Sequence, residues 1–182
     1  MKATNQLSTE HQAILKALKL LQAVAEAWTS GQPEADKDAA SLIEFFKVFS
    51  DRCHHGKEEN LLFPMLNRAG MPIQSGPLGI MLFEHEEGRK FVRNMNDALA
   101  AGRADDFALN ANRYRHLLED HIAKEDNVLY VMADGYLTAE DDAVLIQGFE
   151  AVEREMGEET HDRFHQMLNT LEPRYLRRAE AS

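Results

Sequence analysis

The sequence predicts an all-α protein, an up-down four-helix bundle followed by a C-terminal helical extension. Leu and Ala together number 44, against 19 for Val, Ile and Thr, which favours helices over sheets. Apolar residues recur with alternating spacings of three and four, and no segment alternates like a strand. Gly and Pro gather in short breaks between segments of helical length. These breaks lie at residues 30–33, 69–72, 75–77, 101–102 and 134–135.

The breaks divide the chain into helices that can be taken in order. We expect four long helices, at residues 8–29, 35–67, 77–101 and 104–133. The second of them follows the apolar spacing less regularly than the others. Thr138 is spaced from Asp141 like a helix N-cap, so one or two further helices should follow, to about residue 171. The length of 182 residues fits one compact unit with an appended element, with residues 1–135 as the bundle and residues 136–182 packing on it.

Charge and cysteine content exclude several classes of protein. The formal net charge is −11, so polyanions are repelled, and a general nucleic-acid binder or a polybasic membrane-surface protein is excluded. Cys53 is the only cysteine, which excludes an intramolecular disulfide and a multi-cysteine zinc or iron–sulfur site. The first ten residues are polar, and no apolar run is long enough to cross a bilayer. We therefore expect a soluble, cytoplasmic protein with no nucleic-acid or membrane partner.

Each of the four predicted helices carries a histidine among its inward-facing residues, and two add a glutamate one turn later. The six residues are His11, His54, Glu58, His85, His121 and Glu125. For a single buried histidine, hydrogen bonding within the core is the commoner explanation. A set of four imidazoles and two carboxylates in an apolar interior is costly unless its members are paired or bind a metal. The pattern therefore predicts a shared metal site.

An internal repeat supports the same site. Residues 54–65 (HHGKEENLLFPM) and residues 121–132 (HIAKEDNVLYVM) share six of twelve residues at an offset of 67. A His and a Glu four residues apart lie one turn apart on one helix face, so both can reach the same centre. Two such halves related by an approximate twofold axis supply ligands for two metal ions, with the carboxylates available as bridges. Imidazole and carboxylate without thiolate suit iron, manganese or zinc.

These residues, with the segment HHGKEENLLFP at residues 54–64, resemble the hemerythrin-like, or HHE cation-binding, family over roughly residues 1–135. The resemblance implies a hemerythrin-like four-helix bundle holding two Fe ions, bridged by two carboxylates and an oxo or hydroxo group, with Mn or Zn less expected. The six residues above would be the metal ligands. The ferritin-like pattern does not fit, because its Glu-x-x-His motif occurs once, at Glu158 and His161, outside the four helices.

Two departures from the oxygen-carrying members bear on function. Those members have a fifth histidine where this chain has Arg89, and an aspartate five residues after the last histidine, where this chain has Glu125 at four. The chain is more similar to di-iron proteins linked to oxidative or nitrosative stress and iron-centre repair. We expect a protein that binds or reduces O2, NO or peroxide, with binding favoured and an enzymatic activity left open. The alternative is an iron- or oxygen-sensing or interaction module whose metal controls bundle stability.

Some residues near the predicted site have two interpretations. Each predicted helix has a row of inward-facing residues, its seam. His55 and Glu59 form a second His-x3-Glu pair, turned by about 100° from the seam, and are an alternative to His54 and Glu58. Tyr114 lies two seam positions before His121, where it could border the ligand pocket or serve as plain core.

Further candidates lie outside the four seams. His161 and His165 are one turn apart and could bind a metal or simply cover the bundle. Glu150 and Glu153 could reach the open side of the centre. Cys53 is expected to pack rather than to react. The extension could also support a homodimer.

Overall fold

The computed structural model describes residues 1–176 of the chain. These residues form helices joined by short connections, with no strand among them. The elements are α1 (Lys2–Thr29), α2 (Ala35–Phe45), η1 (Phe46–His55), η2 (Glu58–Leu62), α3 (Phe63–Arg68), α4 (Pro77–Ala100), α5 (Ala104–Lys124), η3 (Glu125–Leu129), α6 (Tyr130–Tyr136), α7 (Ala139–Met156) and α8 (Glu158–Tyr175). The all-α prediction is confirmed.

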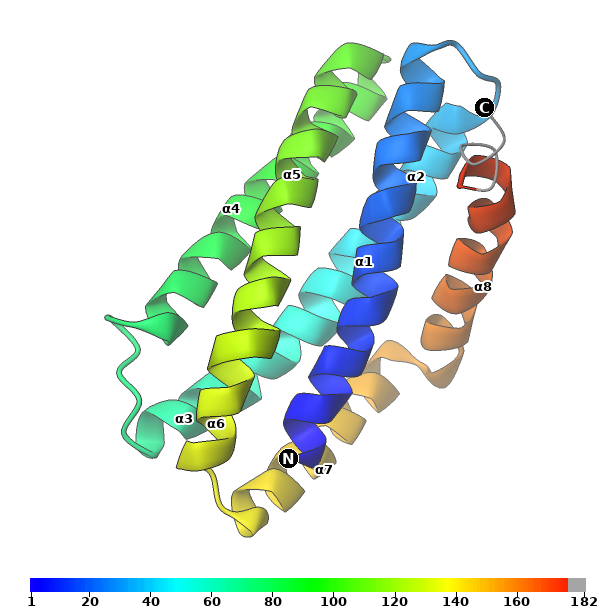
Figure 1. Ribbon diagram of the computed structural model, residues 1–182. Coiled ribbons are helices and arrows are strands. Elements are labelled where there is room, and N and C mark those ends of the chain that lie inside the picture. The colour runs from blue at the N-terminus through cyan, green and yellow to red at the C-terminus, as the bar shows by residue number, and fades with distance from the viewer. Residues whose placement is uncertain (177–182) are drawn as a thin grey trace.

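Four long rods form the bundle (Figure 1). They are α1, the continuous run from α2 to α3, α4, and the continuous run from α5 to α6. The first rod packs on α2 and α5, and α4 packs on the same two partners, which closes the ring. Apolar side chains fill the bundle in two clusters. One lies mainly among α1, α2, α5 and α8, and the other joins the lower part of the bundle to α7.

The first helix begins at Lys2, six residues before its predicted start. A tertiary contact explains the difference. The Asp142 carboxylate accepts hydrogen bonds from the backbone N–H groups of Lys2 and Ala3, which otherwise lack partners at a helix start. Because this cap comes from a residue far away in the chain, local pattern does not reveal it.

Three segments depart from α-helical geometry. The segments η1, η2 and η3 are π-helical, with hydrogen bonds from residue i to i+5. The wider turn reduces the angle between successive side chains below the roughly 100° of an α-helix. The irregular apolar spacing of the predicted second helix falls on η1 and η2. Such segments occur often at functional sites, and here they carry three of the predicted metal ligands.

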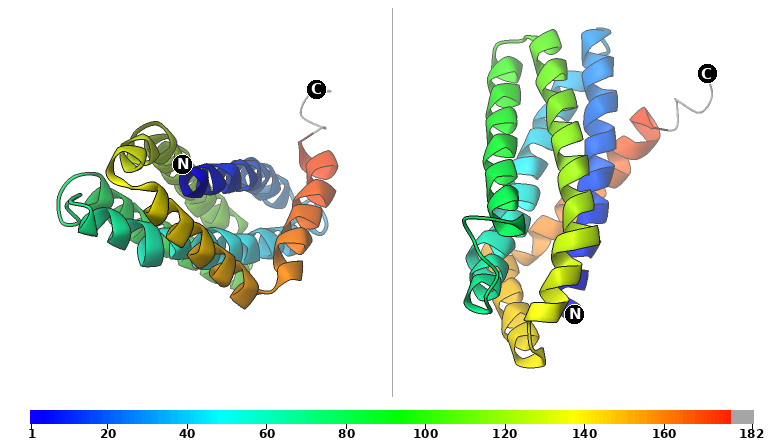
Figure 2. Two further views of the ribbon diagram at one scale, coloured as in Figure 1. Left: turned by 90° about the horizontal axis from the view of Figure 1, so that it is seen from below. Right: turned by 60° about the vertical axis from the view of Figure 1, so that its left-hand side comes forward.

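The C-terminal helices cover one end and one side of the bundle. The predicted cap is confirmed, since Thr138 and Asp141 form a reciprocal capping box at the start of α7. Helix α7 crosses the lower end of the bundle, and α8 runs back beside α1 and α2 (Figure 2). Phe149 of α7 and Phe164 of α8 are buried in the two core clusters. Residues 177–182 of the predicted extension lie outside the described residues.

The length and hydropathy of each described helix determine whether it could cross a bilayer. None of these helices is long and apolar enough to cross a bilayer. The polar residues of interest lie inside the bundle, between the two apolar clusters, and this position defines the candidate site.

Candidate metal centre

Four histidines meet at the middle of the bundle. They come from four different rods, and each exposes no more than 1% of its surface. The Nε2 atoms of His11 and His54 lie 3.0 Å apart, and those of His85 and His121 lie 3.1 Å apart. The imidazoles therefore form two pairs, one in each half of the repeat.

Two carboxylates connect the histidine pairs. Oε2 of Glu125 lies 3.3 Å from Nε2 of His11 and 3.2 Å from Nε2 of His121. Glu58 makes the equivalent approach to the other two imidazoles, at 3.8 and 3.5 Å. Each carboxylate thus spans both pairs, which is the placement that a bridging ligand requires. The structure brings all six predicted residues together.

The unpaired oxygens test whether a cation fits. Glu58 and Glu125 are fully buried, and Oε2 of Glu58 and both carboxylate oxygens of Glu125 receive no hydrogen bond within the described residues. A buried carboxylate without a partner costs several kcal/mol, on the order of a desolvated polar group or more. A metal ion removes that cost, and nitrogen and oxygen donors with no thiolate suit iron, manganese or zinc. The donor set fits a metal.

A second layer of carboxylates orients the imidazoles. On each of the four histidines, Nδ1 faces a carboxylate at 2.7–2.9 Å, and a carboxylate can only accept, so Nδ1 carries the hydrogen and donates. The pairs are His11 with Asp126, His54 with Glu10, His85 with Glu59 and His121 with Glu84. This tautomer leaves the lone pair of every Nε2 directed at the centre, and the carboxylate makes the imidazole a more basic ligand.

The pKa values of the buried carboxyl and imidazole groups show that the six-residue cluster is electrostatically unfavourable without a cation. Burial raises the pKa of Glu58 well above its ordinary value, and the adjacent charge of Glu125 raises it further. Burial acts in the same direction on Glu125, but His121 and His11 hold its pKa well below its ordinary value. Burial lowers the pKa of His54 to about 4, despite the nearby Glu10 carboxylate. A cation or a proton must compensate the two carboxylates.

Comparison with known proteins agrees with this geometry. The family model described as the hemerythrin HHE cation-binding domain matches residues 2–133. The chain belongs to this family. The match covers the four rods and all six residues of the centre, so the resemblance inferred from the motifs is confirmed. A comparison with curated protein sequences finds no significant match.

His55 is a member of the hemerythrin centre that α-helical spacing leaves outside the seam. Its side chain is buried, its ring stacks on His85 with centroids 3.8 Å apart, and one of its nitrogens groups with Glu58, His85 and His121. His55 does not replace His54, because His54 groups with His11 and Glu125. The π-helical turn of η1 explains how two consecutive histidines both face inward. Glu59 does not replace Glu58, because it contacts Nδ1 of His85.

Two tyrosines differ in their relation to the centre. The hydroxyl of Tyr130 donates to Oε1 of Glu58 at 2.8 Å, and its ring stacks on His11. The sequence pattern does not predict Tyr130 as a site residue. The repeat pairs Tyr130 with Phe63, and the two side chains differ only in the tyrosine hydroxyl. Tyr114 is buried against Phe46 and borders a cavity rather than contacting the imidazole pairs.

The extension reaches the second layer of the hemerythrin centre through Glu153. Lys57 is completely buried, and its Nζ lies 2.5 Å from Oε1 of Glu10 and 2.6 Å from Oε1 of Glu153 on α7. Since Glu10 holds Nδ1 of His54, Glu153 acts on a histidine of the centre through two intermediate residues. Glu150, the neighbouring candidate, is exposed.

The remaining candidates lie beside the centre. The Sγ atom of Cys53 lies 3.6 Å from Nε2 of His161, and burial raises the pKa of the thiol to about 11. His161 and His165 line a separate cavity between α1 and α8. Among the described residues, neither histidine belongs to a group of three potential metal ligands. The structure therefore gives Cys53 a neutral thiol in a packed position.

Proposed function

We propose that this hemerythrin domain holds two iron ions and uses them to bind or reduce a small ligand, namely O2, NO or peroxide. The observation that carries the proposal is the arrangement of the unpaired donors. Two imidazole pairs face each other across two carboxylates, and Oε2 of Glu58 and both oxygens of Glu125 have no hydrogen-bond partner among the described residues. In this assignment the ligands are His11, His54, Glu58, His85, His121 and Glu125.

Each residue has a defined role in this proposal. His11 and His54 hold one ion, His85 and His121 hold the other, and the two glutamates bridge them. The Nδ1 hydrogen bonds keep the four rings in their tautomers and orientations while ligands enter and leave. Tyr130 donates to the outer oxygen of Glu58 and so limits rotation of that carboxylate.

The iron pair, when bound, supplies electrons and open coordination positions for a small ligand. Two imidazoles and two shared carboxylates give each ion four ligands from the protein, fewer than the six of octahedral coordination. His55 stacks on His85 and one of its nitrogens groups with the His85–His121 pair, which makes the two positions different. The chain departs from the oxygen carriers at Arg89, which favours a role in oxidative or nitrosative stress or iron-centre repair over simple oxygen carriage.

An anaerobic experiment tests the proposal. The protein is purified without oxygen, its metals are quantified, and its absorption spectrum is recorded before and after addition of O2, NO and peroxide. We expect about two irons per chain and charge-transfer bands that change with at least one of these ligands. A folded protein that binds manganese or zinc instead, or that binds iron without any ligand response, would contradict it.

A second candidate function is sensing, in which iron sets the stability of the bundle. The observation that favours it is the pair of buried carboxyl groups, in which the pKa of Glu58 is raised and the pKa of Glu125 is lowered. Without a metal, the core keeps the free-energy cost of burying these groups, so loss of the metal should destabilise the bundle. Thermal unfolding with and without iron separates the candidates. Loss of the folded state on chelation supports sensing, whereas a bundle that remains folded and resumes ligand binding on reloading supports the di-iron binding protein.

A further inference from the structure

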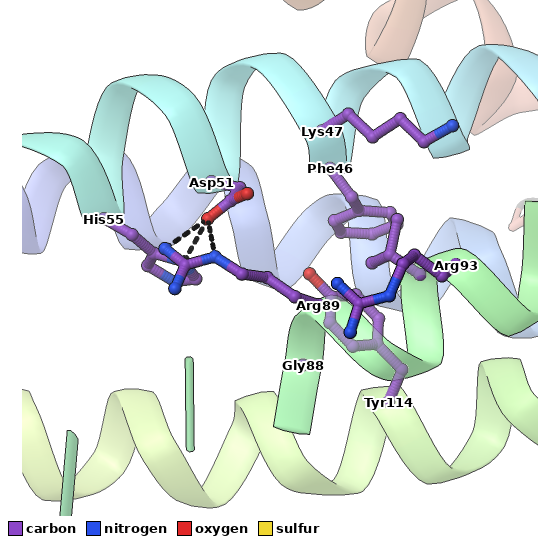
Figure 3. Close-up of a pocket in the computed structure, with 9 residues that line it drawn as sticks. Phe46, Lys47, Asp51, His55, Gly88, Arg89, Arg93 and Tyr114 are labelled. Atoms are coloured by element: carbon purple, nitrogen blue, oxygen red, sulfur yellow. Dashed lines mark hydrogen bonds and ion pairs between the residues drawn. The ribbon is translucent and has the colours of Figure 1, made fainter. Parts of the chain in front are cut away.

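A cavity lies beside the metal centre, between η1 and α4, with Tyr114 of α5 in its wall (Figure 3). Its volume is about 130 Å³. That is several times the roughly 30 Å³ that a water molecule occupies in the liquid, and well below the roughly 300–1,000 Å³ of sites for drug-sized ligands. The cavity therefore has room for a species of a few heavy atoms.

One end of the cavity meets the metal centre. His55 lies at this end, and the ring that stacks on His85 is the same ring that lines the cavity. Nδ1 of His55 is buried without a hydrogen-bond partner among the described residues, and Oδ1 of Asp51 stands 3.5 Å from it. The larger cavity, which contains Glu10 and His161, is lined by none of the residues grouped in the metal cluster. The small cavity therefore reaches the centre at His55, whose nitrogen groups with the His85–His121 pair.

The other end of the cavity is basic. The cavity as a whole is lined by Lys47, Arg89 and Arg93 with a single carboxylate, Asp51, although the chain carries a net charge of −11. Figure 3 shows Lys47 and Arg93 at the end away from His55. A local excess of positive charge on an acidic protein attracts small anions to one place on its surface.

The three cations are not equally available. Arg89 is held by Asp51, Glu59 and Glu86 in ion pairs of 2.7–2.8 Å. Arg93 is exposed and forms no hydrogen bond or ion pair within the described part of the chain, so its charge is free to meet an incoming anion. Within the described residues, the one hydrogen bond from the Lys47 ammonium goes to a neutral amide oxygen, that of Asn96.

The wall between the two ends is apolar and has little spare room. Phe46, Val92 and Tyr114 line it. Gly88 also lies against this wall, where a Cβ would meet the Tyr114 ring at 3.4 Å. A larger side chain at position 92, which is buried in this wall, should therefore obstruct the passage.

We propose that this cavity is the entry site for small monovalent anions, which it delivers to the His85–His121 side of the metal pair. Arg93 and Lys47 attract the anion, and the passage beside Val92 leads it to His55. The inference rests on the proposed function, because the anion must have a metal to reach.

Rapid mixing of the iron-loaded protein with azide, as an anionic probe, and with NO, as a neutral one, tests the inference. Val92→Phe should slow the association of both probes by about tenfold or more, because it fills the passage. Arg93→Glu should slow azide by about threefold to tenfold at low ionic strength, an effect that fades at high salt, and should leave NO unchanged. Arg154→Glu, at an exposed site on α7, is the matched charge control and should change neither rate.

The outcomes separate the two proposals. Failure of the native protein to bind azide or NO, together with no response to O2 or peroxide, would overturn the proposed function. Normal binding with unchanged rates in folded, iron-loaded Val92→Phe would overturn the entry site alone. An azide rate that responds equally to Arg93→Glu and Arg154→Glu would overturn the anion preference. Bromide soaked into crystals of the native protein gives a reading independent of reactivity, since its anomalous signal should appear in the cavity and disappear in Arg93→Glu.

Discussion

The half of the bundle built from α1 and the α2–α3 rod matches the half built from α4 and the α5–α6 rod around the metal centre. Glu10 and Glu84 each precede a histidine of the centre, and each holds the Nδ1 of a histidine in the adjacent rod. Lys57 and Lys124 each contact one of these glutamates. The repeat seen in the sequence is therefore a repeat of hydrogen-bonding roles as well as of residues.

Aromatic contacts follow the same symmetry and then break it. Phe63 stacks on His85, and Tyr130, its counterpart at the offset of 67, stacks on His11. Only Tyr130 has a hydroxyl, and it donates to Glu58, whereas Glu125 has no such partner. In the proposed di-iron centre, the symmetric contacts position two metals, while the departures make the two positions chemically different.

Loss of a bridging carboxylate should have the largest effect. Glu58→Ala and Glu125→Ala should each lower bound iron from about two per chain to one or less and reduce the melting temperature, because each glutamate contacts imidazoles of both pairs. Metal analysis and thermal unfolding measure this. Glu26→Ala, on the exposed face of α1, is the control. If both bridging variants retain two irons, the bridging assignment is wrong.

The next largest effect should be the difference in stability between the variants of Lys57 and Lys124. Lys57 is completely buried between two glutamates, so Lys57→Met should reduce the free energy of unfolding by about 3–5 kcal/mol. Lys124 is 40% exposed, so Lys124→Met should cost only about 0–1 kcal/mol. Chemical denaturation of both variants measures the difference. Equal losses would show that the extension adds nothing to the first half.

The pair His55 and Ile122, which also correspond at the offset of 67, tests the asymmetry of the metal positions. His55→Ala should weaken binding of one iron by about tenfold, in line with loss of a residue that contacts a metal ligand. Ile122→Ala should destabilise the fold by about 2–5 kcal/mol and leave the iron stoichiometry unchanged. Titration with Fe(II) gives both affinities, and identical affinities in the native protein and His55→Ala would remove His55 from the centre.

A small effect should also come from Tyr130→Phe, which makes the second half resemble the first. Loss of the hydrogen bond to Glu58 should reduce the free energy of unfolding by about 1–2 kcal/mol. The absorption bands of the iron-loaded protein should shift without loss of iron. Bands that remain in place would show that the hydroxyl does not influence the bridging carboxylate.

Helix periodicity is sufficient to predict the bundle and the meeting of its six central residues. An α-helical seam projects residues at three and four spacings to one side, so the spacing alone places His11, His85 and their partners together. The outer carboxylates are visible as well, since Glu59 and Asp126 occupy matching places in the repeat. Their roles are not visible, because each contacts a histidine on a different rod.

His55 falls outside the predicted seam because an α-helical angle does not hold throughout its rod. The π-helical turns alter that angle over a few residues, and their presence depends on packing that no local pattern encodes. The role of Glu153 escapes prediction for another reason. Its partner Lys57 is 96 residues earlier in the chain, and only the crossing of α7 under the bundle brings the two together.

The contact between Lys57 and Glu153 also affects the order in which the site is completed during translation. Once the ribosome has added Tyr130, all the repeat-related groups of the half formed by α4 and the α5–α6 rod have been synthesised. Lys57 then still lacks Glu153. At about 5–20 residues per second, the 96 residues that separate Lys57 from Glu153 take about 5–20 s to translate. The half encoded first is therefore the last to acquire its complete surroundings, and a metal ion that arrives during translation meets an unfinished His54 side.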